Sequence, residues 1–401
     1  MRSTSCKEIA RKLLDECLAG HPPKTFPGAL VQDPCGQALF GTLVEGLADR
    51  FEPALCDAYA RLFSQAVAQA VEGLDAAALV ARYDRVRRVR PVAGRPRRVF
   101  ILSRVTLGAD VAVTSVMLAA AKKRFPQASI VFVGPRKNFE LFAADRRIHH
   151  AEVAYRRGSL RERLAAWEEL KGALTATDSA VIDPDSRLTQ LGLLPVCSED
   201  HYHLFESRGY GGESDRPLPD LAADWVEKTL GIAGAKPYVA PGPAPSQAPY
   251  VAVSLGVGEN PAKRLPDPFE EELLRLLAGR GMPLYIDRGA GGEEAERVKR
   301  AVDRSGAKVT FWDGSFAGFA AIVTGAKLYV GYDSAGQHVA AAAGVPLIGI
   351  FAGFPAPRMF ERWRPTGPHC TVIRVDRPDV EETLARVQSA MGNQVVQGRN
   401  S

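Results

Sequence analysis

Residues 327–346, KLYVGYDSAGQHVAAAAGVP, contain the pattern that decides the fold of this chain. The run KLYVGY is short, apolar and aromatic, as in a buried parallel strand, and the alanine-rich segment after it is typical of a helix. Asp333 ends the predicted strand, and the predicted helix begins with Ser334, Ala335 and Gly336. The free backbone N–H groups at the start of a helix favour anions. The stretch therefore predicts a βα unit with an anion site at its turn.

The same alternation extends in both directions along the chain. Apolar runs at YVAVSLG, MPLYIDRG, KVTFWDG, PLIGIF and TVIRV alternate with helical patterns and predict a doubly wound domain over residues 250–401. VFILS, SIVFVG, AEVAY and AVID predict a first Rossmann-like domain over residues 96–234. Residues 235–249 are dense in Pro, Gly and Ala and predict a linker. We therefore expect an α/β protein with two Rossmann-like domains facing a cleft.

Residues 1–95 follow a different pattern. Apolar residues at three- and four-residue spacing predict an N-terminal α-helical region, whose apolar faces require packing on the first domain or on a partner. An arginine-rich connector follows, with arginines at positions 82, 85, 87, 88, 90, 95, 97 and 98. Two interpretations of the connector stay open. It is either a solvated linker lying on an acidic surface or a surface that contacts phosphate head groups or anionic glycolipid.

The composition is that of an ordinary globular protein. The 401 residues are 46% hydrophobic and 24% charged, which excludes a disordered chain or a coiled-coil rod. The net charge of +5 is too small to indicate nucleic-acid binding. The six cysteines form no C-x-x-C pair, which fits reduced thiols. No secretory signal and no run of about 20 apolar residues is present, so we expect a cytoplasmic protein, able to touch the inner face of the membrane.

The first domain has neither of the common nucleotide-binding motifs. No G-x-G-x-x-G follows its first strand and no G-x-x-x-x-G-K-[ST] occurs, which disfavours a dinucleotide oxidoreductase and a P-loop kinase. The first turn instead supplies Gly108 and, at the mouth of the next helix, Asp110. This carboxylate is either a general base in the cleft or an acid that only stabilises the helix N-terminus.

The second domain gathers more charged and polar side chains at one edge. A glycine-containing loop after YVAVSLG carries Lys263 and Arg264, which can neutralise a diphosphate. His338 follows Ser334 by four residues and lies on the same helix face. Taken singly, the two cations are compatible with plain surface charges and the histidine with a core residue. Together they favour a diphosphate site.

At these positions the chain resembles glycosyltransferase family 9, the bacterial ADP-heptose:lipopolysaccharide heptosyltransferases. AKRLPDPF is similar to the family's K-x-W-P at Lys263, with Leu265 in place of Trp. DSAGQHVAAAAGVP is similar to D-[ST]-G-x-x-H-x-A-A-x-x-G-x-P, with Ala335 in place of Gly. ADVAVTSVMLAAAKKRFP is similar to G-D-x-x-x-[ST] followed by R-[FY]-P, with Ala109 in place of Gly, and aligns Asp110 with the family's catalytic aspartate.

The resemblance covers residues 97 to about 376 and implies the GT-B fold with an inverting, metal-independent transfer of a heptose or similar sugar. The donor is a nucleoside-diphosphate sugar, the acceptor is a cell-envelope glycan or glycolipid, and no further cofactor is implied. Asp110 would take the acceptor proton and Lys263 would stabilise the leaving diphosphate. The other expected site residues are Arg264, Asp333, Ser334, Ala335, Gly336 and His338 for the donor, and Asp183 and Arg187 on the acceptor side.

Several alternatives stay open. Arg187 either contacts an anionic acceptor or pairs with Asp183 or Asp185. His201 and His203 are at most half a metal site. The substituted motif positions favour a second function, a catalytically degenerate protein that binds a nucleotide sugar or glycan within an assembly complex. A third, an epimerase or hydrolase acting on a nucleotide sugar, would need Glu259 as its acid.

Overall fold

The computed structural model describes residues 5–34, 36–174, 178–244, 249–258, 260–289 and 291–397. Their contacts divide the chain into two compact units. Unit 1 comprises Met1–Thr106, Val116–Phe139 and Arg146–Lys236, and unit 2 comprises Leu107–Ser115, Glu140–Asp145 and Pro237–Ser401. The two short segments at 107–115 and 140–145 thus cluster with unit 2, although the sequence assigns them to the first domain. The N-terminal region does not form a unit of its own.

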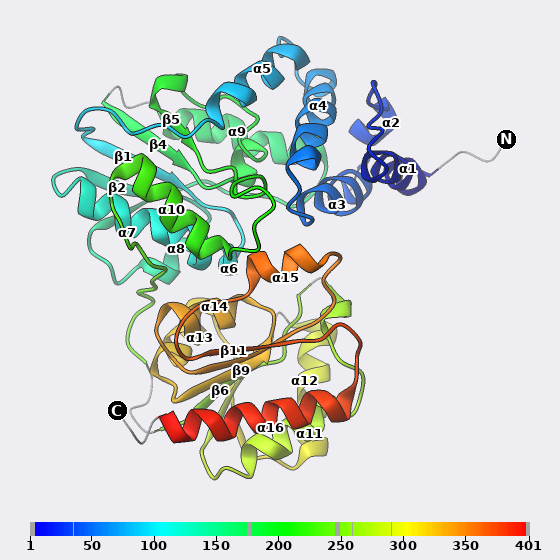
Figure 1. Ribbon diagram of the computed structural model, residues 1–401, viewed down its shortest axis with the longest axis vertical. Helices are drawn as coiled ribbons and strands as arrows, with labels where there is room; N and C mark the ends of the chain where they lie inside the picture. The colour runs from blue at the N-terminus through cyan, green and yellow to red at the C-terminus, as the bar shows by residue number, and fades with distance from the viewer. Residues whose placement is uncertain are drawn as a thin grey trace. The chain divides into compact units, whose positions relative to one another are not determined.

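Unit 1 contains a parallel five-stranded sheet of order β3-β2-β1-β4-β5 (Figure 1). The strands are β1 (Arg98–Leu102), β2 (Ser129–Gly134), β3 (Ile148–Glu152), β4 (Ser179–Asp183) and β5 (Tyr202–Leu204). The crossovers and the C-terminal part of the unit add α7 (Ser115–Arg124), α8 (Arg136–Phe139), α9 (Leu160–Ala173) and α10 (Leu218–Leu230). The chain winds outward from β1 to β3 and then returns to β4, which pairs with β1. The carboxyl ends of β1 and β4 therefore form the topological switch point of this sheet.

The N-terminal region packs on one face of this sheet, as its apolar faces predict. It consists of α1 (Cys6–Leu18), α2 (Gly28–Val31), a π-helix (Gln37–Val44), α3 (Glu45–Ala48), α4 (Pro53–Ala70) and α5 (Ala76–Val86). Leu39 and Phe63 belong to one buried cluster with Leu102 and Val181 of the sheet. Phe63 stacks on Tyr59 with ring centroids 5.1 Å apart. Because this core is continuous, the helices are an integral part of unit 1.

The arginine-rich connector is paired with acidic side chains of unit 1. Arg85 contacts Glu199 at 2.8 Å, and Arg87 contacts Asp57 at 2.6 Å. Arg82 is buried and donates to the carbonyls of Gly192 and Leu193. These pairs support the interpretation of the connector as a segment lying on an acidic surface.

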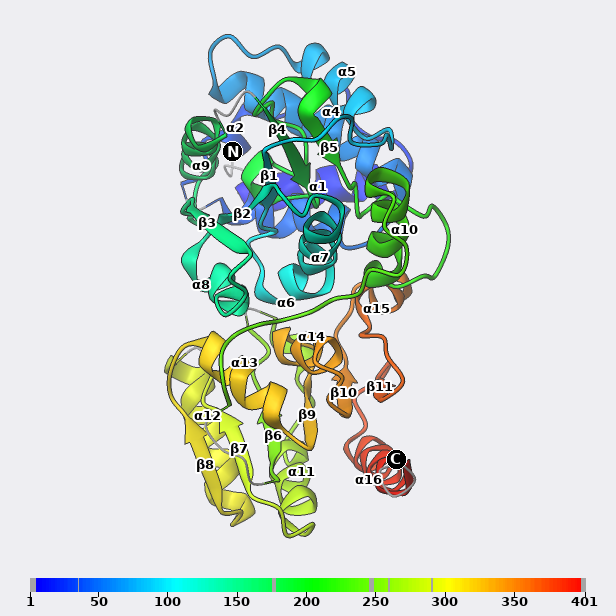
Figure 2. The same cartoon turned by 90° about the vertical axis from the view of Figure 1, so that its left-hand side faces the viewer.

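Unit 2 contains a parallel six-stranded sheet of order β11-β10-β9-β6-β7-β8. The strands are β6 (Val251–Ser254), β7 (Leu284–Asp287), β8 (Val309–Trp312), β9 (Leu328–Tyr332), β10 (Leu347–Phe351) and β11 (Cys370–Arg374). One face packs on α11 (Phe269–Ala278), α12 (Gly292–Ser305) and α16 (Val380–Gln397). The helices α13 (Phe316–Gly325) and α14 (Ala335–Ala342) lie on the other face, and α15 (Pro357–Trp363) precedes β11 (Figure 2). Residues 327–346 thus form the predicted strand and helix.

Within the described ranges, no helix is long and apolar enough to cross a membrane.

Candidate functional site

The candidate donor site lies at the switch point of the second sheet. The strands β6 and β9 are neighbours, although 73 residues separate Ser254 from Leu328. Because the strands are parallel, their carboxyl ends meet at one edge, and the loop after β6 comes to the start of α14. This topology brings together two of the motifs that the sequence analysis identified separately.

Lys263 and Asp333 form a direct ion pair at this edge. The Lys263 Nζ donates to Asp333 Oδ2 at 2.6 Å and to the Asp333 carbonyl oxygen at 3.3 Å. The other carboxylate oxygen, Oδ1, accepts from Gln337 Nε2 at 2.5 Å. The Lys263 side chain is 19% exposed and the Asp333 side chain is 7% exposed. The ammonium group is thus held at the edge of the sheet but is still reached by solvent.

The loop that carries Lys263 is held by close backbone packing. The 3₁₀ turn Pro261–Lys263 is capped by Asn260, whose side chain accepts from the N–H of Ala262 at 3.0 Å. Gly353 follows β10 with φ of +68°, and a Cβ there would lie 2.3 Å from the Ala262 carbonyl oxygen. Both the positive φ and the close approach to Ala262 therefore require glycine at position 353.

Leu265, which replaces the family's Trp, points into the core of unit 2. It is 1% exposed, and its N–H donates to Tyr332 Oη at 3.3 Å. It belongs to the buried cluster that includes Phe269. The substitution therefore lies at a packing position.

The start of α14 offers backbone donors beside this pair. Ser334 is the N-cap residue but makes no capping bond with its side chain, and both Ser334 and Ala335 are half-buried. Gly336 is buried, and a Cβ there would lie 2.4 Å from Tyr329 Oη. The N–H groups of the first turn together with Lys263 provide what a diphosphate needs.

His338 is a buried, neutral histidine next to these groups. It is 6% exposed, and its ring lies 6.0 Å from the ring of Trp363 in an edge-on arrangement. Burial lowers the pKa of His338 to about 4; the Asp333 carboxylate acts in the opposite direction and Lys263 adds to the lowering. The imidazole is therefore uncharged at neutral pH.

Arg264 turns toward α11 instead of the Lys263–Asp333 pair. Its Nε donates to Glu270 at 3.1 Å, and its guanidinium also pairs with Asp267. Arg264 and Arg297 line a cavity of about 670 Å³ in the second unit, together with Glu294 and the loop at Val257. Arg264 thus lines this cavity while pairing with the two carboxylates of Asp267 and Glu270.

Asp110 lies in the segment that packs on α14. It follows α6 (Leu107–Ala109) in a π-helix (Asp110–Thr114), is completely buried, and accepts from Thr114 Oγ1 at 2.6 Å. Gly108 permits the close approach, because a Cβ there would lie 3.0 Å from His338 Cδ2 and 3.2 Å from Ala335 Cα. The structure therefore brings the segment of the expected base to two of the expected donor residues.

The acceptor-side residues have different environments. Asp183 is fully buried and accepts from Thr189 and Tyr202, each at 2.5 Å, and from the N–H of Ser186 at 2.6 Å. Burial raises the pKa of Asp183, and these three hydrogen bonds oppose the rise. Arg187 pairs with neither Asp183 nor Asp185; its ion-pair partner is Glu45, at 3.8 Å.

No cluster of three or more His, Cys, Asp or Glu side chains suited to a metal ion occurs among the described residues. His201 Nδ1 donates to the Ser179 carbonyl oxygen at 2.8 Å. Glu259, the acid required by the third function, lies outside the described residues.

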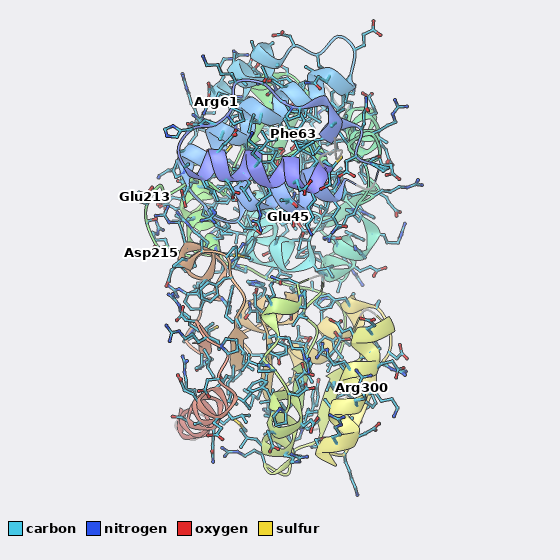
Figure 3. All side chains as sticks on the ribbon, turned by 90° about the vertical axis from the view of Figure 1, so that its right-hand side faces the viewer. Glu45, Arg61, Phe63, Glu213, Asp215 and Arg300 are labelled. Carbon is cyan, nitrogen blue, oxygen red and sulfur yellow. The ribbon has the colours of Figure 1, made fainter. Side chains whose placement is uncertain are left out.

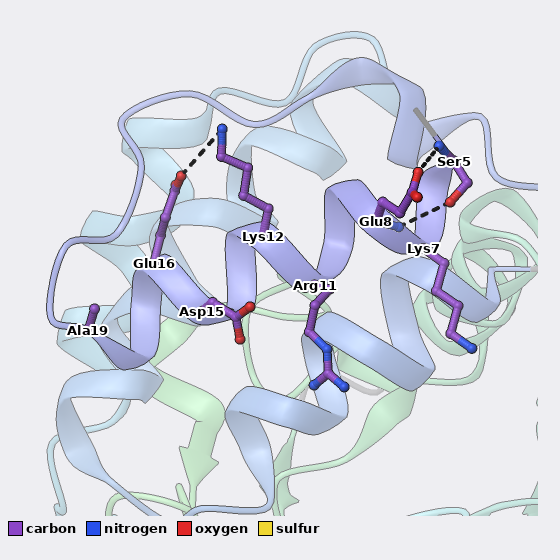
Figure 4. A pocket seen from close by; sticks show the side chains of 8 residues that line it. All are labelled: Ser5, Lys7, Glu8, Arg11, Lys12, Asp15, Glu16 and Ala19. Carbon is purple, nitrogen blue, oxygen red and sulfur yellow. Dashed lines mark hydrogen bonds and ion pairs between the residues drawn. The ribbon is translucent and has the colours of Figure 1, made fainter. Parts of the chain in front are cut away.

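A wide, shallow depression of about 740 Å³ lies along the exposed face of α1 (Figure 4). Two pairs of its side chains interact: Ser5 and Glu8 form a capping box, and Lys12 lies 3.9 Å from Glu16. Nothing in this arrangement selects a ligand.

Two polar residues at the donor edge were not identified from the sequence. Gln337 is buried and orients Asp333 through the bond described above. Asp287 ends β7 in register with Ser254, and burial raises the pKa of its carboxyl. Gln337 was detectable in principle, because it lies four residues after Asp333 on the predicted helix.

Comparison with known proteins shows which family part of the chain resembles. A family model described as glycosyltransferase family 9 (heptosyltransferase) matches residues 201–389. This part of the chain is similar to the family 9 glycosyltransferases. The match includes both Lys263 and Asp333, and it confirms the family and the enzyme class that the motifs predict. No curated protein sequence matches the chain.

Solved structures of family 9 glycosyltransferases have a similar fold at low sequence identity. A family 9 glycosyltransferase from Veillonella parvula has a TM-score of 0.55 at 14% identity, covering 74% of this chain and 90% of its own. E. coli heptosyltransferase WaaC with ADP-2-deoxy-2-fluoro heptose has a TM-score of 0.53 at 19% sequence identity. The match covers 75% of this chain and 99% of the WaaC chain. E. coli ADP-heptose lps heptosyltransferase II has a TM-score of 0.54 at 18% sequence identity, and the match again covers 75% of this chain and 99% of the other. The predicted fold class is therefore confirmed.

Proposed function

We propose that this protein transfers a heptose or similar sugar from a nucleoside-diphosphate sugar to a cell-envelope glycan or glycolipid. The observation that carries the proposal is the Lys263–Asp333 pair beside the start of α14, inside the residues that match family 9. Structures of similar fold contain ADP or an ADP-heptose analogue. A glycolipid acceptor would be met in the cytoplasm, at the inner face of the membrane.

In the proposed reaction the nucleophile is an acceptor hydroxyl. Asp110 takes its proton while the oxygen attacks the anomeric carbon from the face opposite the diphosphate, so that configuration inverts. The bond from the anomeric carbon to the diphosphate breaks, and the nucleoside diphosphate leaves with the electron pair. Lys263 and the N–H groups at Ser334, Ala335 and Gly336 would stabilise that charge without a metal ion.

The burial of Asp110 adds a requirement to this mechanism. A base with no exposed surface cannot reach an acceptor hydroxyl. Substrate binding must therefore open the segment Leu107–Ser115, a local rearrangement of a kind that commonly limits turnover.

The proposal is tested with Asp110→Asn, using ADP-heptose and a deacylated lipopolysaccharide core as probes. We expect turnover to fall by about 100-fold or more while donor affinity is retained, because a general base contributes that much to transfer and nothing to donor binding. Asp313→Asn is the control, since that carboxylate is 73% exposed and pairs with Arg288 on the surface of unit 2. Unchanged turnover in Asp110→Asn would exclude Asp110 as the base.

The alternative of a binding protein without transferase activity has its own signature in the same experiment. Tight donor binding by the wild-type protein, with no transfer to any acceptor tried, would favour that alternative. The observation that favours this alternative is the complete burial of Asp110, the expected base.

A further inference from the structure

The N-terminal helices contribute a charged residue to the carboxyl edge of the first sheet. Glu45 is the first residue of α3, and its Oε1 lies 3.8 Å from Arg187 Nη2 in the turn after β4. The Glu45 side chain is 50% exposed and the Arg187 side chain is 23% exposed. Figure 3 labels Glu45 on the side of unit 1 that carries these helices. Both residues belong to unit 1.

Building on the proposed function, we propose that Arg187 binds an anionic group of the acceptor sugar, and that Glu45 is the resident counter-ion that this group displaces. The anion is a phosphate or a carboxylate carried by the sugar. The N-terminal helices then determine acceptor specificity.

The backbone that carries Arg187 is fixed by its neighbours. Ser186 begins the turn Arg187–Thr189, donates its N–H to Asp183 at 2.6 Å, and accepts from the N–H of Leu188 at 3.1 Å. The Ser186 hydroxyl also donates to the Ser103 carbonyl at the end of β1. Arg187 is thus held at the switch point, where open parallel sheets bind ligands.

Two carboxylates of this edge already have buried partners. Asp185 accepts from Arg208 at 2.9 and 3.1 Å, and its carboxylate is completely buried. Asp183 is bonded as described above. Of the carboxylates in the described ranges, Glu45 is the one within ion-pair distance of Arg187. In this loop, Arg187 is therefore the cation that has a solvent-exposed partner, Glu45.

The Glu45–Arg187 pair is suited to exchange. At 3.8 Å the two groups attract each other but share no hydrogen bond, and exposed pairs of this kind contribute little to stability. A phosphate or carboxylate that reaches the guanidinium can instead form two parallel charge-assisted hydrogen bonds. Replacing Glu45 by such a ligand is therefore favourable once the ligand is held by its sugar.

The N-terminal helices also hold the loop that follows Arg187. Tyr59 of α4 donates to the Gln190 carbonyl at 2.9 Å, and Arg82 of α5 donates to the Gly192 carbonyl at 2.9 Å. Gln190 and Leu191 have φ of +50° and +59°, a conformation that non-glycine residues seldom adopt. The loop is therefore held in place by a region outside the residues that match family 9.

The test measures binding of anionic sugars in a background in which the donor site is disabled. Glucose 1-phosphate and glucuronate are titrated calorimetrically into Lys263→Ala protein, with methyl glucoside as the neutral probe. We expect Glu45→Gln to tighten the binding of at least one of the two anionic sugars about 3- to 10-fold and Arg187→Gln to weaken it about 10-fold or more. Methyl glucoside should not respond to either change.

Matched controls separate this effect from general changes in charge. Glu16→Gln removes a carboxylate paired at 3.9 Å on the same helical region, and Arg216→Gln removes an arginine paired at 3.8 Å in the same unit. Both should leave the affinities unchanged. Three results would each overturn the proposal. Arg187→Gln binds both anionic sugars with unchanged affinity, or Glu45→Gln increases the affinity for neither sugar. The third is that the Glu45→Gln variant binds neither sugar with a dissociation constant below about 10 mM. Donor binding through Lys263 is measured separately, so such a failure leaves the transferase proposal standing.

Discussion

The carboxyl edges of the two sheets use charge in different ways. In unit 1, Asp185 and Arg208 form a pair in which neither side chain is more than 3% exposed, and Asp183 beside them has three hydrogen bonds. In unit 2, Lys263 meets Asp333 with 19% of the lysine side chain exposed, beside the start of a helix. The first arrangement fixes loops, and the second leaves a cation within reach of a ligand. Lys263, whose partner leaves it accessible, is therefore a better candidate for ligand binding than the buried charges of unit 1.

The buried pair of unit 1 offers the largest expected effect. Arg208→Met removes one partner and leaves the buried Asp185 side chain without its ion pair, which should cost about 3–5 kcal/mol of unfolding free energy. Arg216→Met is the matched control, because that side chain is 50% exposed and its loss should cost at most about 1 kcal/mol. Urea unfolding followed by tryptophan fluorescence measures both. Equal losses in the two variants would show that the buried pair does not stabilise unit 1.

Acid stability gives the second comparison, because each unit contains one histidine with a strongly lowered pKa. Burial, aided by the charge of Arg90, lowers the pKa of His203 in unit 1 to about 4, and burial has the same effect on His338 in unit 2. Between the unfolded value near 6.5 and the folded value, the unfolded chain binds more protons. Stability therefore falls as the pH drops through this window, by up to about 3 kcal/mol for each histidine.

His203→Gln and His338→Gln should each remove one part of this pH dependence. Unfolding free energies measured between pH 7 and pH 4 provide the test, and His21→Gln, on the exposed loop after α1, is the control. A slope that is unchanged in both buried-histidine variants would contradict the assigned pKa values.

A smaller effect is expected where unit 2 departs from the family motif. Leu265→Trp restores the family's residue at a side chain that is only 1% exposed, so the larger ring should overpack the core and cost about 1–3 kcal/mol. Phe311→Trp, at a position that is 37% exposed, should change stability by less than about 0.5 kcal/mol. Thermal unfolding of both variants tests this. Increased stability of Leu265→Trp would mean that the core has room for the ring.

The sequence was sufficient for the fold class and for naming two residues that meet at one edge of the second sheet. Strand-length apolar runs alternating with helices predict two parallel sheets, and both are present. Lys263 and Asp333 were each identified from their motifs. Their direct contact follows from the pairing of β6 with β9, which a pattern along the chain does not contain.

Other features depend on packing between segments that are distant in sequence. The position of Arg264 in the sequence does not determine whether its side chain points to the sheet edge or to Glu270, with which it pairs in the structure. The burial of Asp110 depends on contact between its segment and α14, more than 200 residues later. Tyr59 and Gln190 are likewise 131 residues apart. Local periodicity identifies residue types that can act in a site, but long-range contacts decide which of them are accessible.

The most direct test of the central claim is the affinity of the second unit's edge for a nucleoside diphosphate. Calorimetric titration of ADP, UDP and GDP would be carried out on the wild-type protein, on Lys263→Ala and on Lys299→Ala, whose lysine is 50% exposed and pairs with Asp303 on α12. We predict that at least one nucleotide binds the wild type and Lys299→Ala equally, and binds Lys263→Ala about 10-fold or more weakly, because a charge-assisted contact to phosphate is lost. Equal affinity in Lys263→Ala and the wild type, or no binding of any nucleotide, would contradict the assignment of this edge as the donor site.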